Sequence, residues 1–213
     1  RPGYDFIGWA TAADGEVVYT DSESVLNLSE VQGDAVSLYA KWSPASGTKY
    51  ISKHWLQNVN DDKYTLEETN EHSGVTESMT NVIAHTYSGF TADAITQEVI
   101  SGDGTTEVNV YYTRNNYDIR WLGYNGEIVT TTSQRFESEI VEPETEKPLR
   151  TGYTFAGWAV DDTTVPVGGT SVSAKWSPIT YKVQFNTNFG VNTVAGEQEI
   201  AYDKSTALMA NTI

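Results

Sequence analysis

The sequence predicts a mainly β fold, α+β at most, built from small tandem modules. The chain repeats itself, and the repeated strings alternate apolar with polar residues, which is the period of a strand with one buried face. The composition agrees, because 13 Tyr, 6 Trp and 6 Phe suit half-buried pleated strands. A chain of 213 residues has room for three or four modules of about 60 to 70 residues. We therefore expect an elongated string of modules.

Two strings of the sequence occur twice. RPGYDFIGWA at 1–10 matches RTGYTFAGWA at 150–159, and LYAKWSP at 38–44 matches VSAKWSP at 172–178. The stretch between the two strings is shorter in the second copy, as expected when a loop joins two strands. Each pair of strings therefore predicts two strands of one repeat.

The opening half of the repeat also recurs. YDIRWLGYNG at 117–126 aligns with YKVQFNTNFG at 181–190, and both strings alternate as strands do. Asn125-Gly126 and Phe189-Gly190 place a glycine where each chain should reverse, and Asn-Gly is a strong signal for a tight hairpin turn. Each string therefore predicts a hairpin.

These matches divide the chain into four segments. Residues 116–178 hold a complete repeat, residues 1–46 the C-terminal half of a repeat, and residues 179–213 the N-terminal half of another. Residues 47–115 are interpreted as a related module with the same ground plan. The expectation is a piece of a longer array, with any targeting or anchoring signal outside it.

The middle segment carries coarser signals. Tyr50–Trp55 and residues 107–115 alternate as strands, and His85–Phe90 stands where RTGYTF stands in the repeat. One short helix per module is compatible with Ser29–Gln32 or Thr76–Val82, although Thr and Val disfavour it.

The string RTGYTFAGW followed by AKWSP resembles the Listeria-Bacteroides repeat, the internalin B-type repeat of bacterial surface proteins. The resemblance implies small β-grasp-like modules displayed outside the cell, on the surface or wall of Gram-positive or gut bacteria, without catalytic residues. The signature positions predicted to be structural are Gly3, Tyr4, Phe6, Gly8, Trp9, Lys41, Trp42, Trp121, Gly152, Tyr153, Phe155, Gly157, Trp158, Lys175 and Trp176.

Two features qualify this resemblance. Residues 47–115 are instead similar to mucin-binding-type repeats, through the element Tyr87–Phe90 and a final strand ending in Tyr111-Tyr112. The complete repeat also departs from its family's pattern, because Val172-Ser173 replaces the usual aromatic and Trp121 stands where Phe is commoner. The departures concern the core of the repeat.

The repeated Gly-Trp pairs at 8–9 and 157–158 are interpreted as structural. A Trp ring in a strand needs a neighbour without a side chain, and a buried Trp supplies a large share of a small core. The alternative is a platform of Trp rings that stack on sugars. Residues repeated in every unit more naturally serve folding, which every unit must do.

Lys41 and Lys175 both precede a Trp in a closing strand, so their side chains should point to the opposite, exposed face. The alternative is an intramolecular amide between Lys and Asn, formed with the help of a buried acid. A module this small seldom buries such an acid.

No metal, cofactor or catalytic site is predicted. The acidic run Glu137, Glu139, Glu142, Glu144, Glu146 lacks the Asp-x-Asp-x-Asp-Gly pattern of a calcium loop. His54, His72 and His85 have spacings that fit no helical metal pair, and we expect isolated surface or cap residues. Cysteine is absent, as are the GxSxG, HExxH and phosphate-loop motifs, so an enzyme is disfavoured.

Charge and hydropathy limit the classes of partner that the chain could bind. A net charge of −16 repels nucleic acid, and no apolar run is long enough to enter a membrane. The leading hypothesis is a non-catalytic stalk that supports adhesion and contacts only neighbouring repeats. The alternatives are a direct adhesin, in which residues 47–115 bind a host glycan or extracellular protein, and head-to-tail self-association through exposed strand edges.

Overall fold

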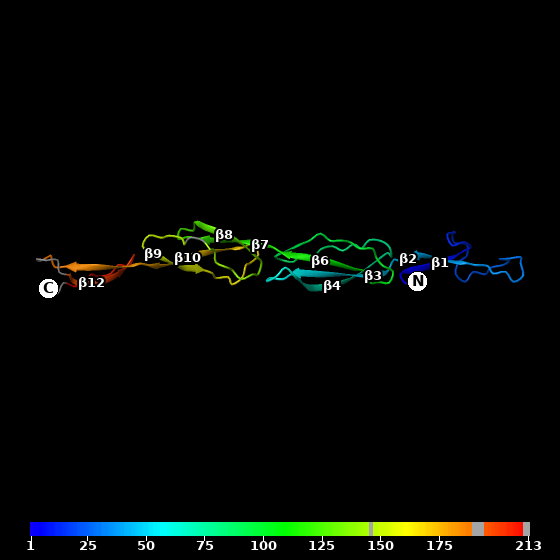
Figure 1. The fold of residues 1–213 in the computed structure, drawn as a ribbon, viewed down its shortest axis with the longest axis horizontal. Coiled ribbons are helices and arrows are strands. Elements are labelled where there is room, and N and C mark those ends of the chain that lie inside the picture. The colour runs from blue at the N-terminus through cyan, green and yellow to red at the C-terminus, as the bar shows by residue number, and fades with distance from the viewer. Residues whose placement is uncertain (145–146, 189–193, 211–213) are drawn as a thin grey trace. The chain divides into compact units, whose positions relative to one another are not determined.

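The computed structural model describes residues 1–144, 147–188 and 194–210. All regular secondary structure in this part of the chain is β-strand, so the predicted mainly β class is confirmed (Figure 1). Residues 29–32 and 76–82 form bends, turns and irregular segments instead of the short helices that the sequence allowed. Among the described residues, no helix is present that could span a bilayer.

The chain divides into two compact units, residues 1–114 and residues 115–213. In the first unit, β1 (Tyr4–Ala10) and β2 (Tyr39–Pro44) form a two-stranded antiparallel sheet. The second sheet of this unit has four strands in the order β4-β3-β6-β5. Its strands are β3 (Thr48–Gln57), β4 (Tyr64–Gly74), β5 (Phe90–Ala92) and β6 (Glu107–Arg114).

The second unit also contains a four-stranded and a two-stranded sheet. The four-stranded sheet has the order β8-β7-β10-β9, and β11 pairs with β12 in an antiparallel hairpin. The strands are β7 (Asn116–Leu122), β8 (Ile128–Arg135), β9 (Tyr153–Ala159), β10 (Thr170–Pro178), β11 (Thr180–Asn186) and β12 (Val194–Ala201).

The two four-stranded sheets share one topology, in which the first and last strands lie side by side at the centre and run parallel. Ile51 of β3 pairs with Glu107 of β6, and Ile119 of β7 pairs with Thr170 of β10. Parallel pairing needs a long crossover, which is usually helical. Here the crossover runs through an edge strand, β5 or β9, and irregular segments, so the middle segment has the same ground plan as the complete repeat.

The core of the middle segment lies between its sheet and the crossover. Val108, Val110 and Tyr112 are buried from β6, as their alternation predicts. The crossover supplies Val82 and Ile100, which are 3% and 2% exposed. The crossover thus covers the inner face of the sheet as a helix would.

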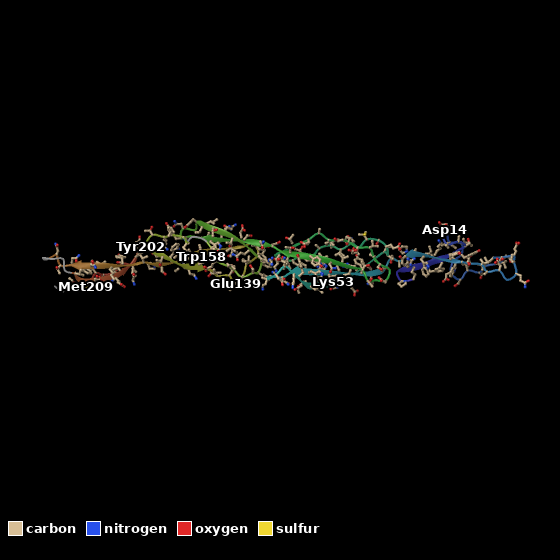
Figure 2. The ribbon with its side chains drawn as sticks, viewed as in Figure 1. Asp14, Lys53, Glu139, Trp158, Tyr202 and Met209 are labelled. Atoms are coloured by element: carbon tan, nitrogen blue, oxygen red, sulfur yellow. The ribbon has the colours of Figure 1, made fainter. Side chains whose placement is uncertain are left out.

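The complete repeat has a core of its own. Trp121 of β7 is fully buried and meets Trp158 of β9, which is labelled in Figure 2, edge to face, with ring centroids 5.1 Å apart. Val165 from the crossover and Val172 of β10 pack against them. An aromatic pair in this geometry adds about 0.5 to 1.5 kcal/mol to its area burial.

A glutamine side chain stabilises each crossover. Gln97 accepts a hydrogen bond from the Val82 N–H at 2.9 Å and donates one to the Val82 carbonyl at 2.7 Å. Gln134 makes the same pair of bonds with Val141, at 2.9 and 2.8 Å. These bonds replace the backbone partners that a regular strand or helix would provide.

The hairpin turn predicted at Asn125-Gly126 is confirmed, since Gly126 has φ 79° in the turn between β7 and β8. The turn predicted at Phe189-Gly190 lies outside the described residues. Glu146 of the acidic run also lies outside them. The segment boundaries, the β-grasp resemblance and the elongation remain predictions.

Candidate functional site

The motif aromatics of the first half-repeat gather around Phe6. Its ring lies edge to face against Trp9 at 5.1 Å and against Trp42 at 5.4 Å, measured between centroids. In the complete repeat, Phe155 takes the same place between Trp158 and Trp176, at 5.2 and 6.0 Å. The repeated aromatics therefore contact one another within each copy.

The structure gives the glycines of the Gly-Trp pairs a different reason from the one predicted. Gly8 follows an irregularity in the pairing of β1 with β2 and has φ 140°. A Cβ there would lie 2.5 Å from the Tyr19 carbonyl oxygen. Gly157 has φ 103°, with open space around its missing side chain. Backbone conformation, and at Gly8 a crossing chain, require these glycines, not the neighbouring indole.

The motif lysines have different surroundings. Lys41 is half-buried, and its Nζ donates a hydrogen bond to the Ala13 carbonyl at 2.9 Å, which ties β2 to the loop after β1. Lys175 is exposed on β10. The motif residues Gly3, Tyr4, Gly152 and Tyr153 lie at the starts of their strands.

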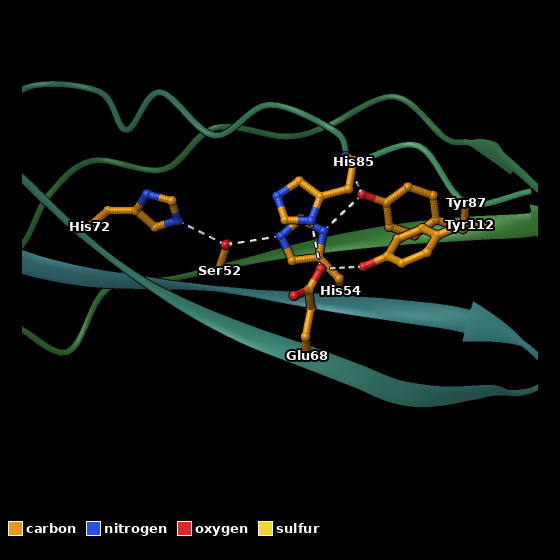
Figure 3. A network of polar contacts seen from close by, with 7 residues as sticks. All are labelled: Ser52, His54, Glu68, His72, His85, Tyr87 and Tyr112. Carbon is orange, nitrogen blue, oxygen red and sulfur yellow. Dashed lines mark hydrogen bonds and ion pairs between the residues drawn. The ribbon is translucent and has the colours of Figure 1, made fainter.

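A polar network of seven residues lies in the middle segment (Figure 3). Ser52 and His54 point inward from β3, since they follow Tyr50 at the two-residue period of the strand. The crossover brings His85 to His54, and the remaining members come from β4, the crossover and β6. They are Glu68, His72, Tyr87 and Tyr112.

His54 is the buried centre of this network, with 1% of its surface exposed. Its Nδ1 lies 2.7 Å from the Tyr112 hydroxyl, and its Nε2 lies 3.1 Å from Ser52 Oγ. Ser52 Oγ in turn lies 2.9 Å from His72 Nε2. Both ring nitrogens of His54 are therefore engaged, as burial of a polar ring requires.

His85 and Glu68 form the half-exposed edge of the network. The imidazole of His85 stacks on that of His54, with centroids 4.2 Å apart and an interplanar angle of 18°. Its Nδ1 lies 2.5 Å from Glu68 Oε1, and the Tyr87 hydroxyl donates to the same oxygen. One carboxylate thus accepts from two side chains of the crossover.

The network shifts the proton affinities of its members. Burial, followed by repulsion from His85, lowers the pKa of His54. Hydrogen bonds from Tyr87 and His85 lower the pKa of Glu68. Burial, together with the bond to Glu68, raises the pKa of Tyr87. The network therefore favours a neutral His54 beside an ionised Glu68.

The same residues are a candidate metal set, because ligand atoms of His54, Glu68 and His85 lie within 4.8 Å of one another. A metal ion must approach each imidazole nitrogen along its lone pair, which lies in the ring plane. In two nearly parallel stacked rings these directions do not converge. The arrangement therefore serves hydrogen bonding better than metal coordination.

The sequence prediction of surface or cap histidines is wrong for His54, whereas His85 is exposed as predicted and His72 is partly buried. His54 is buried and is linked through Ser52 to His72, while it stacks on His85. The alternation Tyr50, Ser52, His54 places a histidine on the inner face and could have signalled the burial. The position of His85 depends on the path of the crossover, which no local pattern indicates.

The outer face of the same sheet carries aromatic rings. The ring of Tyr111 stacks on Trp55 at 6.3 Å and meets Tyr64 edge to face at 5.0 Å, between centroids. Tyr111 is 41% exposed, as is Leu66 beside Trp55 on β4. The Trp55 indole donates to Asn109 Oδ1 at 2.7 Å. We call Trp55, Tyr64, Leu66 and Tyr111 the aromatic face.

Comparison with protein families identifies the repeats. The family model of the Listeria-Bacteroides repeat domain matches residues 1–41 and 117–174. These two segments are therefore similar to Listeria-Bacteroides repeats. The match confirms the resemblance read from the RxGYxFxGW and AKWSP strings, and it leaves the likeness of residues 47–115 to mucin-binding repeats a prediction.

The chain is also similar to a much longer curated protein. A protein of Evansella cellulosilytica, named as a Gly-rich membrane protein, is 23% identical over 94% of this chain. The chain spans 24% of the length of that relative. The likeness to the repeat family and to this relative is the basis of the function proposed below.

Proposed function

We propose that the chain is a non-catalytic stalk that holds other parts of a secreted or cell-wall-displayed bacterial protein away from the cell and so supports adhesion. One observation carries the proposal: the complete repeat and the middle segment share a sheet topology, and each has its own closed core. Modules that fold around separate cores can be added or removed without disturbing one another.

Charge favours the same function. The net charge of −16 makes neighbouring stalks repel one another over about 10 Å or less at physiological salt. The chain has no cysteine and so no disulfide bonds, and its modules are stabilised by aromatic cores such as that of Trp121 and Trp158. The chain can therefore work outside the cell independently of redox conditions.

Surface display tests the stalk. The full chain is placed between a cell-wall anchor and an epitope, in one and in two copies, and binding of an epitope antibody to intact cells is measured. Accessibility of the epitope should rise with the second copy. If the epitope is equally accessible with no copy, one copy and two copies of the chain, the stalk function is refuted.

The second candidate function is direct ligand binding through the aromatic face. Exposed aromatic rings stack on the apolar faces of sugars, and Asn109 beside Trp55 adds a polar group. A host glycan is therefore the ligand that this face suits best.

A binding screen separates the two functions. The full chain is applied to glycan and matrix-protein arrays, together with Trp55→Ala and, as a control, Tyr124→Ala, which removes a 52% exposed ring from the turn between β7 and β8. Saturable binding that only Trp55→Ala abolishes would favour the adhesin. The stalk hypothesis predicts that the full chain and both variants show no saturable binding.

A further inference from the structure

The start of each RxGY motif contacts the module that follows it, and does so in the same way in both units. We call the contact between residues 1–46 and 47–114 the first joint. The contact between residues 150–178 and 179–210 is the second joint.

The first joint consists of a backbone relay and one side-chain bond. The Ala45 N–H donates to the Gly3 carbonyl at 2.9 Å, and the Ala45 carbonyl accepts from the Thr76 N–H at 3.0 Å. The Tyr4 hydroxyl donates to the Glu77 carboxylate. The residue after Pro44 thus connects the motif glycine to a turn of the next module.

The second joint repeats each of these contacts. The Ile179 N–H donates to the Gly152 carbonyl at 2.9 Å, and the Ile179 carbonyl accepts from the Tyr202 N–H at 2.8 Å. The Tyr153 hydroxyl donates to Asp203 Oδ2 at 3.0 Å. Two following modules with different turn sequences therefore offer the same turn to the same motif.

The motif arginine supports its tyrosine in both copies. The guanidinium carbon of Arg1 lies 3.6 Å from the ring centroid of Tyr4, and that of Arg150 lies 3.7 Å from Tyr153. A guanidinium over an aromatic face is attracted to it and limits its rotation. The arginine thus orients the hydroxyl toward the acceptor.

The glycine of the motif leaves room for the next module. A Cβ on Gly3 would lie 2.2 Å from Gly102 Cα, and a Cβ on Gly152 would lie 2.2 Å from the Tyr202 ring. Both glycines also have positive φ, 72° and 79°. A side chain at either position would separate the modules as well as strain the backbone.

The acceptor carboxylates occupy an unusual backbone position. Glu77 and Asp203 have φ 68° and 56°, in turns closed by hydrogen bonds from Ser78 to Val75 and from Lys204 to Ala201. Glycine or asparagine is the residue that such a position favours. Glu137, with φ 62°, stands at the same turn position of the complete repeat. An acid therefore recurs at this turn position in three modules, although glycine or asparagine would suit the backbone better.

We propose that the Arg-x-Gly-Tyr sequence of each repeat is a joint that binds the following module: its tyrosine hydroxyl donates a hydrogen bond to an acid in the left-handed position of the turn that follows that module's first two strands. The inference rests on the proposed stalk function and assigns its partner: any next module with a carboxylate at this turn. The joint limits the angles that two successive modules can adopt.

The test measures freedom at the second joint in the full chain. The protein has no cysteine, so Asp162→Cys and Glu199→Cys place single spin labels on exposed sites to either side. Double electron–electron resonance spectroscopy gives the distribution of distances between the two labels. Variants Tyr153→Phe and Asp203→Gly remove the hydroxyl and the carboxylate, and Tyr181→Phe, 47% exposed on β11, is the control.

The proposal predicts that Tyr153→Phe and Asp203→Gly broaden the distribution and raise the population of bent joints by roughly threefold to tenfold, as expected for one lost hydrogen bond. Tyr181→Phe should leave it unchanged. Asp203→Gly is the sharper variant, because glycine relieves the left-handed backbone and would tighten a turn that is only structural.

An unchanged distribution in Tyr153→Phe or Asp203→Gly, or equal broadening in Tyr181→Phe, would overturn the joint. That failure differs from failure of the stalk, which is read from epitope display and ligand screens. If the spin-label distances show no joint but the epitope display gives the expected result, the chain is a stalk with flexible connections between its modules.

Discussion

His54 and His85 stack at 4.2 Å inside a network that holds one of them away from water. Two imidazolium ions at this distance would repel each other, and burial already opposes charge on His54. The stack therefore favours a neutral His54 and is opposed by protonation of that ring.

We expect the middle segment to lose stability as the pH falls. The pKa of His54 is lowered in the folded state from 6.5, so its contribution is present above pH 6.5 and is lost as the pH falls through the folded value. Glu68, whose pKa is lowered from 4.5, adds a loss below about pH 4.5. Denaturant unfolding between pH 7.5 and 5 measures the first loss.

A variant isolates the histidine in this experiment. His54→Gln keeps a hydrogen-bonding side chain but cannot titrate, so its free energy of unfolding should vary less between pH 7.5 and 5. An equal pH dependence in His54→Gln and the unsubstituted chain would contradict the assignment.

We expect zinc to leave the melting temperature unchanged at micromolar concentration. His54 uses both nitrogens for Tyr112 and Ser52, and its ring stacks on His85 with lone pairs that do not converge. Differential scanning fluorimetry with and without Zn²⁺ checks this. A rise in melting temperature that His54→Gln abolishes would show that the stack opens to coordinate the ion.

Removing the amide of Gln97 should destabilise the middle segment. Gln97→Ala leaves the N–H and carbonyl of Val82 without their partner beside a nearly buried side chain, at a cost of about 1 to 3 kcal/mol. Gln184→Ala on the exposed face of β11 is the matched control and should change little. Urea unfolding followed by circular dichroism measures both, and equal losses would contradict the prediction.

Truncating Trp121 should unfold the complete repeat more readily than any change at an exposed Trp. Trp121→Ala leaves a cavity beside Trp158 and removes the donor to Thr132, so we expect a loss of about 3 to 5 kcal/mol. Trp42→Ala, at a ring 37% exposed, should cost much less. Thermal unfolding compares the two variants.

The local part of the fold could be predicted from the sequence. Strings such as YDIRWLG specify β7, because alternation appears within a few residues, and Gly126 marks its turn. The parallel pairing of β7 with β10 could not be predicted, since its partners lie about fifty residues apart and neither strand encodes its neighbour.

The candidate sites show the same division. The aromatic clusters follow from the repeated strings, whereas the contact of Tyr153 with Asp203 does not, because Asp203 lies in the next module and its turn sequence differs from VTES around Glu77. The motif glycines were predicted to matter, but their reason lay in backbone conformation and in chains that cross them.

The central parallel pair has a mechanical consequence. The chain enters the complete repeat at the start of β7 and leaves it at the end of β10, and these strands lie side by side. Tension on the two ends therefore pulls the strands in opposite directions along their lengths. The hydrogen bonds between the two strands therefore bear the force together, in shear, and do not break one after another. The same holds for β3 and β6.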